Sequence, residues 1–219
     1  MVDFACYKFA SKVSEIAISF NHKYASKKIS LEVGLTSDEL QHLPKKEADT
    51  KVQPFLKFLI ENLADFYIEF GEKMYNIPPS KHGWEQSKVD EMIDTTGLHY
   101  VSIFLSGEMV GFISFLMTEE SITGASGKRI LYLMEIHLNK KQTGHGIGGY
   151  IIQDYLLKLC NKLKMDLEFV CFKKNNIGNS FYEKMAIRKL AEEENQQLEF
   201  WFSFLNVYRM DYKSISKKV

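Results

Sequence analysis

Residues 130–149 read ILYLMEIHLNKKQTGHGIGG, an apolar run followed closely by a cluster of glycines. An almost wholly apolar run such as 130–138 is typical of a strand buried at the centre of a sheet. Positions 144–149 then hold four glycines within six residues. Behind them, apolar residues recur with helical spacing, namely Ile151, Ile152, Tyr155, Leu156 and Leu159. The segment therefore predicts a central strand, a glycine-rich turn and a helix, in that order.

The glycine-rich turn predicts a phosphate site. Glycines at such a turn let the backbone approach a ligand closely, and the free N–H groups of a helix N-terminus favour a phosphate. The turn satisfies the GxGxxG pattern, but a dinucleotide-binding fold needs a preceding strand of a parallel unit and an acidic residue after the next strand. Here a predicted antiparallel hairpin precedes the turn, and the next strand ends in Lys173-Lys174. The P-loop pattern fails as well, because Gly127-Lys128 is followed by Arg129.

The rest of the chain predicts helices and strands that fit one mixed sheet. Helical spacing predicts helices over 4–20, from Pro54 to about Tyr75, over 85–93 and over 179–185. Strand patterns cover 98–105 and 109–117 as a hairpin, then 167–172 and 197–208. We expect 21–50 to be loop with one short extended piece. The predicted fold class is α+β, a mixed, mostly antiparallel central sheet flanked by helices, with residues 1–52 as an N-terminal helical extension that packs on or precedes a domain over 53–213.

Composition narrows the class of protein. With 45% hydrophobic residues the chain can bury a core, and its 28 basic and 28 acidic residues cancel, unlike those of a nucleic-acid binder. Cys6, Cys160 and Cys171 show neither CxxC nor metal-ligand spacing, so we expect reduced thiols and no metal. No apolar run reaches the roughly 20 residues of a membrane span, and no signal peptide is evident. We therefore expect a soluble intracellular protein that binds neither nucleic acid directly nor membranes.

Two motifs resemble the Gcn5-related N-acetyltransferase (GNAT) superfamily. Its Gln/Arg-x-x-Gly-x-Gly/Ala motif matches Gly146 and Gly148 in frame, although Thr143 stands where glutamine or arginine is usual. Its downstream pattern Asn-x-x-Ala-x-x-x-Tyr appears here with Asn175 and Tyr182, and with glycine in place of alanine. The resemblance implies a GNAT fold and an acyltransferase that uses acetyl-CoA and no metal.

The resemblance also implies which residues bind acetyl-CoA. In such enzymes the amides of the turn hold the pyrophosphate, while the backbone of the central strand pairs with the pantetheine arm. The positions implied on this chain are Ile136, His137, Leu138, Gly144, His145, Gly146, Ile147, Gly148, Gly149 and Asn175. Further candidates for the remaining phosphate are Lys140, Lys141, Lys173 and Lys174.

Shorter stretches between about 73 and 187 resemble the N-alpha-acetyltransferase D (NatD) family, which acetylates the N-termini of histone 4 and histone 2A. The matching pieces include Met74-Tyr75, Trp84, Lys88, Glu91-Met92, 110–115, 118–120, Leu131-Tyr132, Glu135, 145–148 and Phe172-Lys173. The chain departs from the family at Met134, where a tyrosine facing the substrate is common, and at Thr143. The resemblance implies histone tails beginning Ser-Gly-Arg-Gly as partners and a location in the cytoplasm and nucleus, and it leaves ribosome association open.

Charge independently favours a basic peptide as substrate. Residues 84–120 hold seven acidic side chains and one basic side chain, Lys88. Such a segment would steer an Arg/Lys-rich tail toward it. Glu119 and Glu120 end a strand beside the expected groove, and the resemblance implies that acids here hold the early residues of the substrate. The other expected substrate contacts are Tyr75, Trp84, Met134, Val170 and Trp201.

Acetyl transfer needs a neutral amine and a proton for the departing thiolate. Glu135 is the candidate base, because burial in an apolar strand would raise the pKa of its carboxyl group toward a useful value. It could act directly or through a water, with Tyr132 orienting the amine. We place His137 in the core or against the cofactor. Tyr182 is the candidate acid, since a tyrosine pKa near 10 against about 8.5 for a thiol makes that transfer uphill by only about 2 kcal/mol.

The predicted function is direct transfer of acetyl from acetyl-CoA to the N-terminal amine of proteins within a ternary complex. No cysteine is placed to carry an acyl group, which favours direct transfer over a covalent enzyme intermediate. Two alternatives stay open. The chain could be a GNAT enzyme that acts on lysine side chains or small amines, or a non-catalytic module that binds histone tails or CoA.

Overall fold

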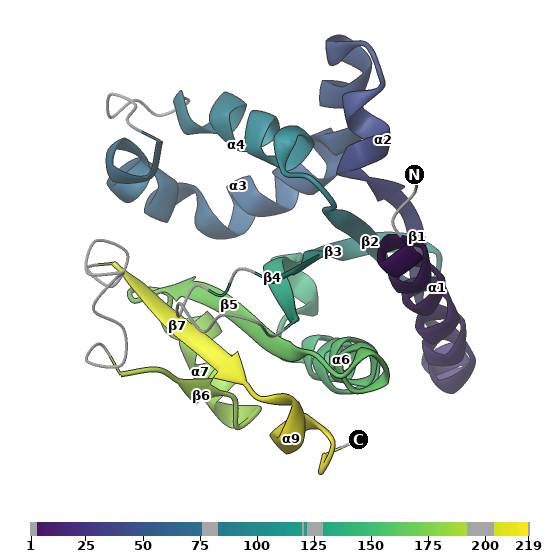
Figure 1. Ribbon diagram of the computed structural model, residues 1–219. Helices are drawn as coiled ribbons and strands as arrows, with labels where there is room; N and C mark the ends of the chain where they lie inside the picture. The colour runs from purple at the N-terminus through teal and green to yellow at the C-terminus, as the bar shows by residue number, and fades with distance from the viewer. Residues whose placement is uncertain (1–3, 76–82, 120, 122–128, 192–203, 219) are drawn as a thin grey trace.

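The computed structural model describes residues 4–75, 83–119, 121, 129–191 and 204–218 (Figure 1). Within them lies a seven-stranded sheet of order β1-β2-β3-β4-β5-β7-β6. Its strands are β1 (Ile29–Thr36), β2 (His99–Leu105), β3 (Glu108–Thr118), β4 (Ile130–Leu138), β5 (Asp166–Phe172), β6 (Arg188–Lys189) and β7 (Leu205–Met210). Neighbouring strands are antiparallel except β4 and β5, which are parallel. The predicted mixed, mostly antiparallel sheet is therefore confirmed.

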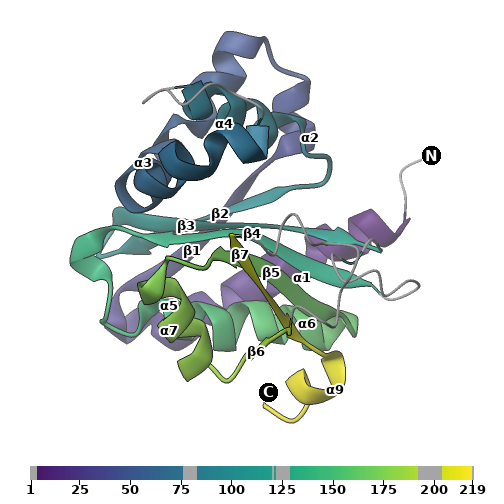
Figure 2. The ribbon, with the colours of Figure 1, turned by 90° about the vertical axis from the view of Figure 1, so that its left-hand side faces the viewer.

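Helices cover both faces of the sheet (Figure 2). One face carries α2 (Ser37–Gln41), α3 (Lys45–Tyr75) and α4 (Gly83–Asp94). The other carries α1 (Phe4–Tyr24), α5 (Ile147–Ile151), a π-helical turn (Ile152–Leu156) that leads into α6 (Leu157–Leu163), α7 (Asn176–Lys184) and α9 (Tyr212–Ile215). Each face has its own apolar core, one built with α1 and α6 and the other with α3 and α4. None of the described helices has the length and apolarity that crossing a bilayer requires.

Several local predictions are confirmed. The stripe on α1, formed by Phe9, Val13, Ile16, Ala17 and Phe20, is buried. The hairpin of β2 and β3 turns at Ser106 and Gly107, both at positive φ. The predicted helix over 85–93 corresponds to α4, and the one over 179–185 to α7. Of the last predicted strand, 204–208 falls in the described residues, whereas 197–203 lies outside them.

The prediction for 21–50 is wrong in part: its one extended piece corresponds to β1, but the segment expected to be loop also holds α2 and the start of α3. β1 pairs with β2, and it is an edge strand on which Ile29 and Leu31 are buried, so its apolar signal is short. A capping box between Thr36 and Glu39 begins α2. Helix α3 begins at Lys45, well before Pro54, which lies inside the helix.

Candidate active site

Strands β4 and β5 are paired at one end and separate at the other. Their parallel pairing covers Ile130–Tyr132 against Asp166–Glu168 and then stops. Beyond that point, the described residues give β4 only β3 as a strand partner and β5 only β7. The backbone of residues 133–138 therefore has one side without a strand partner. This is an edge to which an extended ligand can hydrogen-bond in the way a strand would.

A β-bulge at Met134 determines which side chains face α3 and α4. Ser114 pairs with Glu135 and Phe115 with Leu133, so Met134 is the extra residue. Leu133 and Ile136 pack into the core beneath α1 and α6, whereas Met134 packs into the core beneath α3 and α4. Glu135 contacts α4 as well. A bulge re-aims side chains in this way, and here it turns two consecutive residues toward the same helical layer.

Glu135 lies at the centre of a buried charged cluster. One carboxylate oxygen, Oε1, is 2.7 Å from Nζ of Lys88 on α4, and Oε2 is 2.7 Å from Nε2 of His137. Lys88 Nζ is also 2.7 Å from Oε1 of Glu91. Burial acts to raise the pKa of Glu135, but the Lys88 ammonium and the His137 hydrogen bond outweigh burial and lower the pKa to about 2. The expected rise in this pKa is therefore wrong, because the sequence did not reveal the ion pair.

The two candidate tyrosines both keep their protons. Burial raises the pKa of Tyr132, and the nearby Glu135 carboxylate adds to the effect. Burial likewise raises the pKa of Tyr182 well above its usual value, where the ring packs against Phe169, Phe181 and Tyr208. Proton transfer from Tyr182 to a thiolate is therefore more costly than the ordinary pKa values of the two groups indicate.

The expected substrate contacts gather beside this cluster where they are described. Trp84 on α4 stacks on Tyr67 of α3 with ring centroids 4.5 Å apart. Met134 and Val170 pack into the same core. Trp84 is 2% exposed, and its Nε1–H has no hydrogen-bond partner within the described part of the chain. A buried donor without a partner is costly and calls for an explanation.

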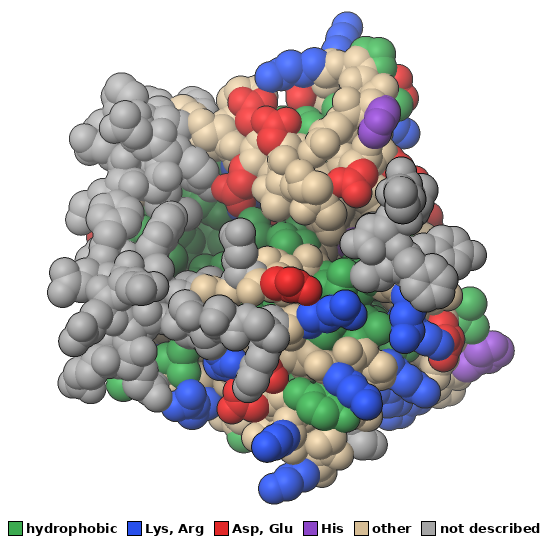
Figure 3. Space-filling model, viewed as in Figure 1, with side chains coloured by type: hydrophobic (Ala, Val, Ile, Leu, Met, Phe, Trp, Pro, Cys, Tyr) green, Lys and Arg blue, Asp and Glu red, His purple; other side chains and the backbone are tan. Residues whose placement is uncertain are grey.

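The remaining substrate contacts are more peripheral. Glu119 is exposed and lies 3.8 Å from Arg129. The side chain of Tyr75, and all of Glu120 and Trp201, lie outside the described residues. Acidic side chains also gather over α4 (Figure 3), where Asp90 pairs with Lys45.

The glycine turn follows β4 directly along the chain. Gly144 and Gly146 have φ values of +81° and +84°, a conformation that costs other residues about 1–2 kcal/mol. Gly146 caps the helix that begins at Ile147. A Cβ at Gly148 would lie 3.2 Å from the Phe181 ring, so this glycine permits α5 to approach α7. The turn therefore presents backbone N–H groups at the start of α5, with glycine at four of its six positions, a few residues after the open edge along the chain.

The other expected cofactor residues differ in what they offer. Ile136, Leu138 and Ile147 pack into the core, so they can offer only backbone groups, and His145 is exposed. His137 is buried against Glu135 and the Phe112 ring. The Asn175 side chain caps α7 by accepting a hydrogen bond from Gly178 N. Of the lysines, Lys174 pairs with Glu69.

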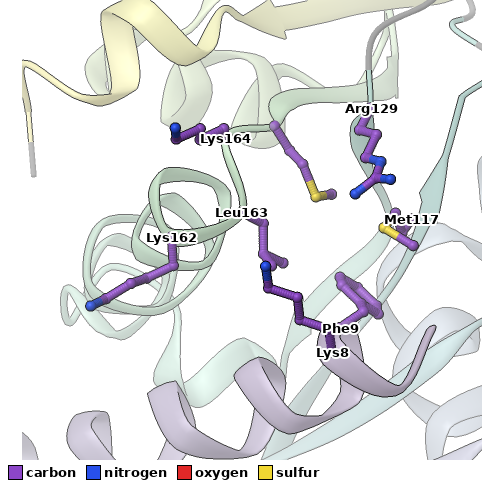
Figure 4. Close-up of a pocket in the computed structure, with 8 residues that line it drawn as sticks. Lys8, Phe9, Met117, Arg129, Lys162, Leu163 and Lys164 are labelled. Atoms are coloured by element: carbon purple, nitrogen blue, oxygen red, sulfur yellow. The ribbon is translucent and has the colours of Figure 1, made fainter. Parts of the chain in front are cut away.

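A separate cavity of about 220 Å³ lies near the other end of β4 (Figure 4). It is lined by Lys8, Phe9, Met117, Arg129, Lys162, Leu163, Lys164 and Met165. None of the catalytic, cofactor-binding or substrate-binding residues predicted from sequence lines this cavity. The Lys162 side chain points away from it (Figure 4). Among the described residues no group of three or more His, Cys, Asp or Glu side chains is placed to hold a metal ion.

Residues 60–186 match the acetyltransferase (GNAT) family. Because this match covers more than half of the 219 residues, the chain belongs to that family. It is also 28% identical over 120 residues to N-alpha-acetyltransferase 40 of Saccharomyces cerevisiae. That alignment covers 52% of this chain and 41% of the yeast protein, so the chain matches less than half of its relative's length.

The similar solved structures include two with low sequence identity to this chain. One is Arabidopsis thaliana Naa50 in complex with the bisubstrate analogue CoA-Ac-MVNAL, at 14% identity and a TM-score of 0.48, covering 84% of this chain and 99% of that one. The other is the PaiA N-acetyltransferase of Thermoplasma acidophilum in complex with coenzyme A, at 14% identity and a TM-score of 0.44, covering 83% and 99%.

Sequence reasoning missed two features of the site. The bulge at Met134 depends on the pairing of β3 with β4 and leaves no local signal. The contact of Lys88 with Glu135 had a partial signal, because Lys88 follows Trp84 by one helical turn on the buried side of α4. A charged residue on an otherwise apolar stripe indicates a buried partner.

Proposed function

We propose that this chain is an N-alpha-acetyltransferase that transfers acetyl from acetyl-CoA to the N-terminal amine of basic peptides. The observation that carries the proposal is the open edge of β4, with Glu135 turned toward α4 by the bulge and the glycine turn following the strand. Membership of the acetyltransferase (GNAT) family supports the reaction class. The likeness to yeast N-alpha-acetyltransferase 40 and the resemblance to NatD support an N-terminal amine as acceptor.

The described residues fit acetyl-CoA at two places. The N–H groups of 144–149 would hold its pyrophosphate, because Gly144 and Gly146 adopt positive φ and have no side chains of their own to block a close approach. The backbone of 136–138 would pair with the pantetheine arm along the open edge. Acetyl-CoA supplies the thioester carbonyl that the amine attacks.

In the reaction, a nitrogen–carbon bond forms and the carbon–sulfur bond breaks. The amine gives up one proton to solvent through a water next to Glu135. Tyr182 gives one proton to the released thiolate and regains it from solvent. With a pKa of about 2, Glu135 is ionised at neutral pH and accepts a hydrogen bond from the amine or from a water next to it. A peptide amine has a pKa of about 8, so part of it is already neutral near that pH. We assign orientation of the amine to Glu135 and Tyr132, and proton donation to Tyr182.

The peptide side of the proposal rests on α4. The Trp84 Nε1–H is a buried donor that a peptide carbonyl would satisfy. Acidic side chains on α4 would attract arginine and lysine residues of the tail. Together with the NatD resemblance, these features support the tails of histone 4 and histone 2A as partners, and the cytoplasm and nucleus as the location.

The test is turnover of acetyl-CoA with a peptide beginning Ser-Gly-Arg-Gly, beside the same peptide with a blocked α-amine and free lysines. Product only from the free N-terminus supports the proposal. Product from both peptides indicates an enzyme that acts on lysines or amines in general. No product, with acetyl-CoA still bound, overturns catalysis on this peptide and favours a binding module.

A further inference from the structure

We propose that Lys88 is a positioning residue that keeps Glu135 ionised and fixed at the open edge of β4. This inference deepens the proposed function and rests on it. Lys88 lies on α4, outside the strand and glycine turn that define the site, and acts on the substrate only through Glu135.

The geometry leaves Glu135 little freedom. Lys88 is 3% exposed and Glu135 is 9% exposed. Lys88 contacts Oε1 and His137 contacts Oε2, each at 2.7 Å, so both carboxylate oxygens are held. The two holders come from different elements, α4 and β4, which fixes the carboxylate relative to both the helix and the strand.

Packing alone does not explain a lysine at this position. The other buried residues of α4 are Trp84, Val89, Met92 and Ile93, and they form an apolar stripe over the sheet. An apolar residue at position 88 would continue that stripe. Replacing a buried ion pair with well-packed apolar residues is often neutral or stabilising, so a buried pair is weak evidence for a stability role. The Lys88–Glu135 pair lies at the open edge of β4, and Trp84, one helical turn before Lys88, has an Nε1–H without a hydrogen-bond partner among the described residues. This location favours a role in binding the substrate.

Burial and several other ionisable groups also affect the ionisation of Glu135, and the charge of Lys88 acts against burial. The titratable groups that interact with Glu135 electrostatically are Tyr67 on α3, Tyr100 on β2, His137 and Tyr132 on β4, and Tyr182 on α7, and Glu91 on α4 pairs with Lys88. Glu91 carries a like charge, and His137 is charged only if protonated. Lys88 therefore supplies the positive charge that does not depend on the histidine.

The consequence is a pH dependence that Lys88 suppresses. Without Lys88, burial favours the protonated carboxyl, and the pKa of Glu135 rises. A protonated Glu135 can no longer accept the hydrogen bond of the amine. Loss of Lys88 should therefore reduce activity more at low pH than at high pH.

The experiment measures kcat/KM between pH 5.5 and 8.5 for wild type, Lys88→Met and Lys88→Arg, each as a ratio to wild type. Taking the ratio removes the titration of the substrate amine. We expect the kcat/KM ratio of Lys88→Met to wild type to fall as the pH decreases, by up to tenfold per pH unit below the raised pKa of Glu135. The ratio for Lys88→Arg should not change with pH. Glu91→Gln is the matched control, because it removes a charge from the same cluster without raising the pKa of Glu135.

A double variant and a titration separate the inference from the proposed function. Lys88→Met should cause no further loss in a Glu135→Gln background, because it acts through Glu135. Carbon-13 NMR of glutamate-labelled protein should show the Glu135 carboxyl titrating at higher pH in Lys88→Met than in wild type, and this readout needs no activity.

A level Lys88→Met ratio, additive losses in the double variant, or an unmoved Glu135 titration overturns the inference. If Lys88→Met does not fold, a level Lys88→Gln profile would overturn it equally. If wild type turns over no peptide but the Glu135 carboxyl still titrates at higher pH in Lys88→Met than in wild type, the proposed function is contradicted and the Lys88–Glu135 coupling stands.

Discussion

The described residues hold two buried charged clusters, one along the paired stretch of β4 and β5 and one beyond it, where the two strands separate. At the paired end, Arg209 on β7 reaches Asp166 at 2.6 Å, Glu168 at 2.8 Å and Asp211 at 3.1 Å. Ser121 also donates to Glu168. Here β5 has strand partners on both sides, so the cluster is enclosed by completed hydrogen-bond ladders.

The Glu135 cluster lies where β4 has lost its second strand partner. Burial and ion pairing are similar in the two clusters, so neither property distinguishes a structural site from a functional one. The open strand edge does, because it lets a ligand hydrogen-bond beside the charged group. The paired end should therefore respond to mutation mainly in stability, and the diverging end mainly in activity.

The largest expected effect is the loss of stability in Arg209→Met. The substitution removes the guanidinium that pairs with Asp166 and with the fully buried Glu168, and removing one partner of a buried pair costs about 3–5 kcal/mol. Urea unfolding measures the change. Lys88→Met should cost less, because Glu135 keeps His137 and sits at the open edge. Equal losses in the free energy of unfolding for Arg209→Met and Lys88→Met would contradict the distinction between a structural and a functional cluster.

The next effect is the loss of activity in Glu135→Gln. The variant removes a charged hydrogen-bond acceptor from the amine, and we expect kcat/KM to fall by roughly 100-fold, equivalent to about 3 kcal/mol. Lys88 keeps Glu91 as a partner, so unfolding should change little. Glu168→Gln is the matched control at the paired end and should lower stability while the folded protein keeps its turnover. If Glu135→Gln instead lowered stability and Glu168→Gln lowered turnover, the Glu135 cluster would be the structural one and the Arg209 cluster the functional one.

Gly111→Ala tests how closely β3 must approach the diverging end. A Cβ at Gly111 would lie 2.1 Å from the carbonyl oxygen of His137, so one strand must move. We expect a loss of about 1–3 kcal/mol in the free energy of unfolding, as for other overpacked sites. Gly34→Ala on β1 has nothing within 4 Å and should be close to neutral. A tolerated Gly111→Ala would mean that the β3–β4 spacing adjusts freely.

The smallest expected effect concerns the glycine turn. Gly146→Ala places a side chain at φ +84°, and a strain of about 1–2 kcal/mol corresponds to roughly tenfold weaker acetyl-CoA binding if the turn must hold this shape. Gly34→Ala should bind as wild type, since nothing lies within 4 Å of its Cβ and it lies outside the proposed cofactor site. Calorimetric titration with acetyl-CoA compares the two. Similar affinities for the two variants would show that acetyl-CoA binding does not depend on the conformation of the turn at Gly146.

Local signals in the sequence predicted the parts of the fold that depend on neighbouring residues. The apolar run of β4, the glycines after it and the buried stripe of α1 all carry such signals. They failed for β1, where buried residues are few, and for the start of α3, where Lys45 and Lys46 open a helix without an apolar pattern. The ionisation of Glu135 could not be predicted, because its pKa depends on α4 lying over β4, a contact between distant residues.

The edge strand β1 has a practical consequence for where this chain can be shortened. A version beginning at Pro54 would keep every residue assigned to the site. It would also uncover the edge of β2 along its pairing with β1, together with the apolar surface that α1 now covers. Exposed edges and apolar faces of this kind favour aggregation. Residues 4–53 thus shield the sheet edge and this apolar surface from solvent. We therefore expect solubility, before catalysis, to limit how far the chain can be shortened.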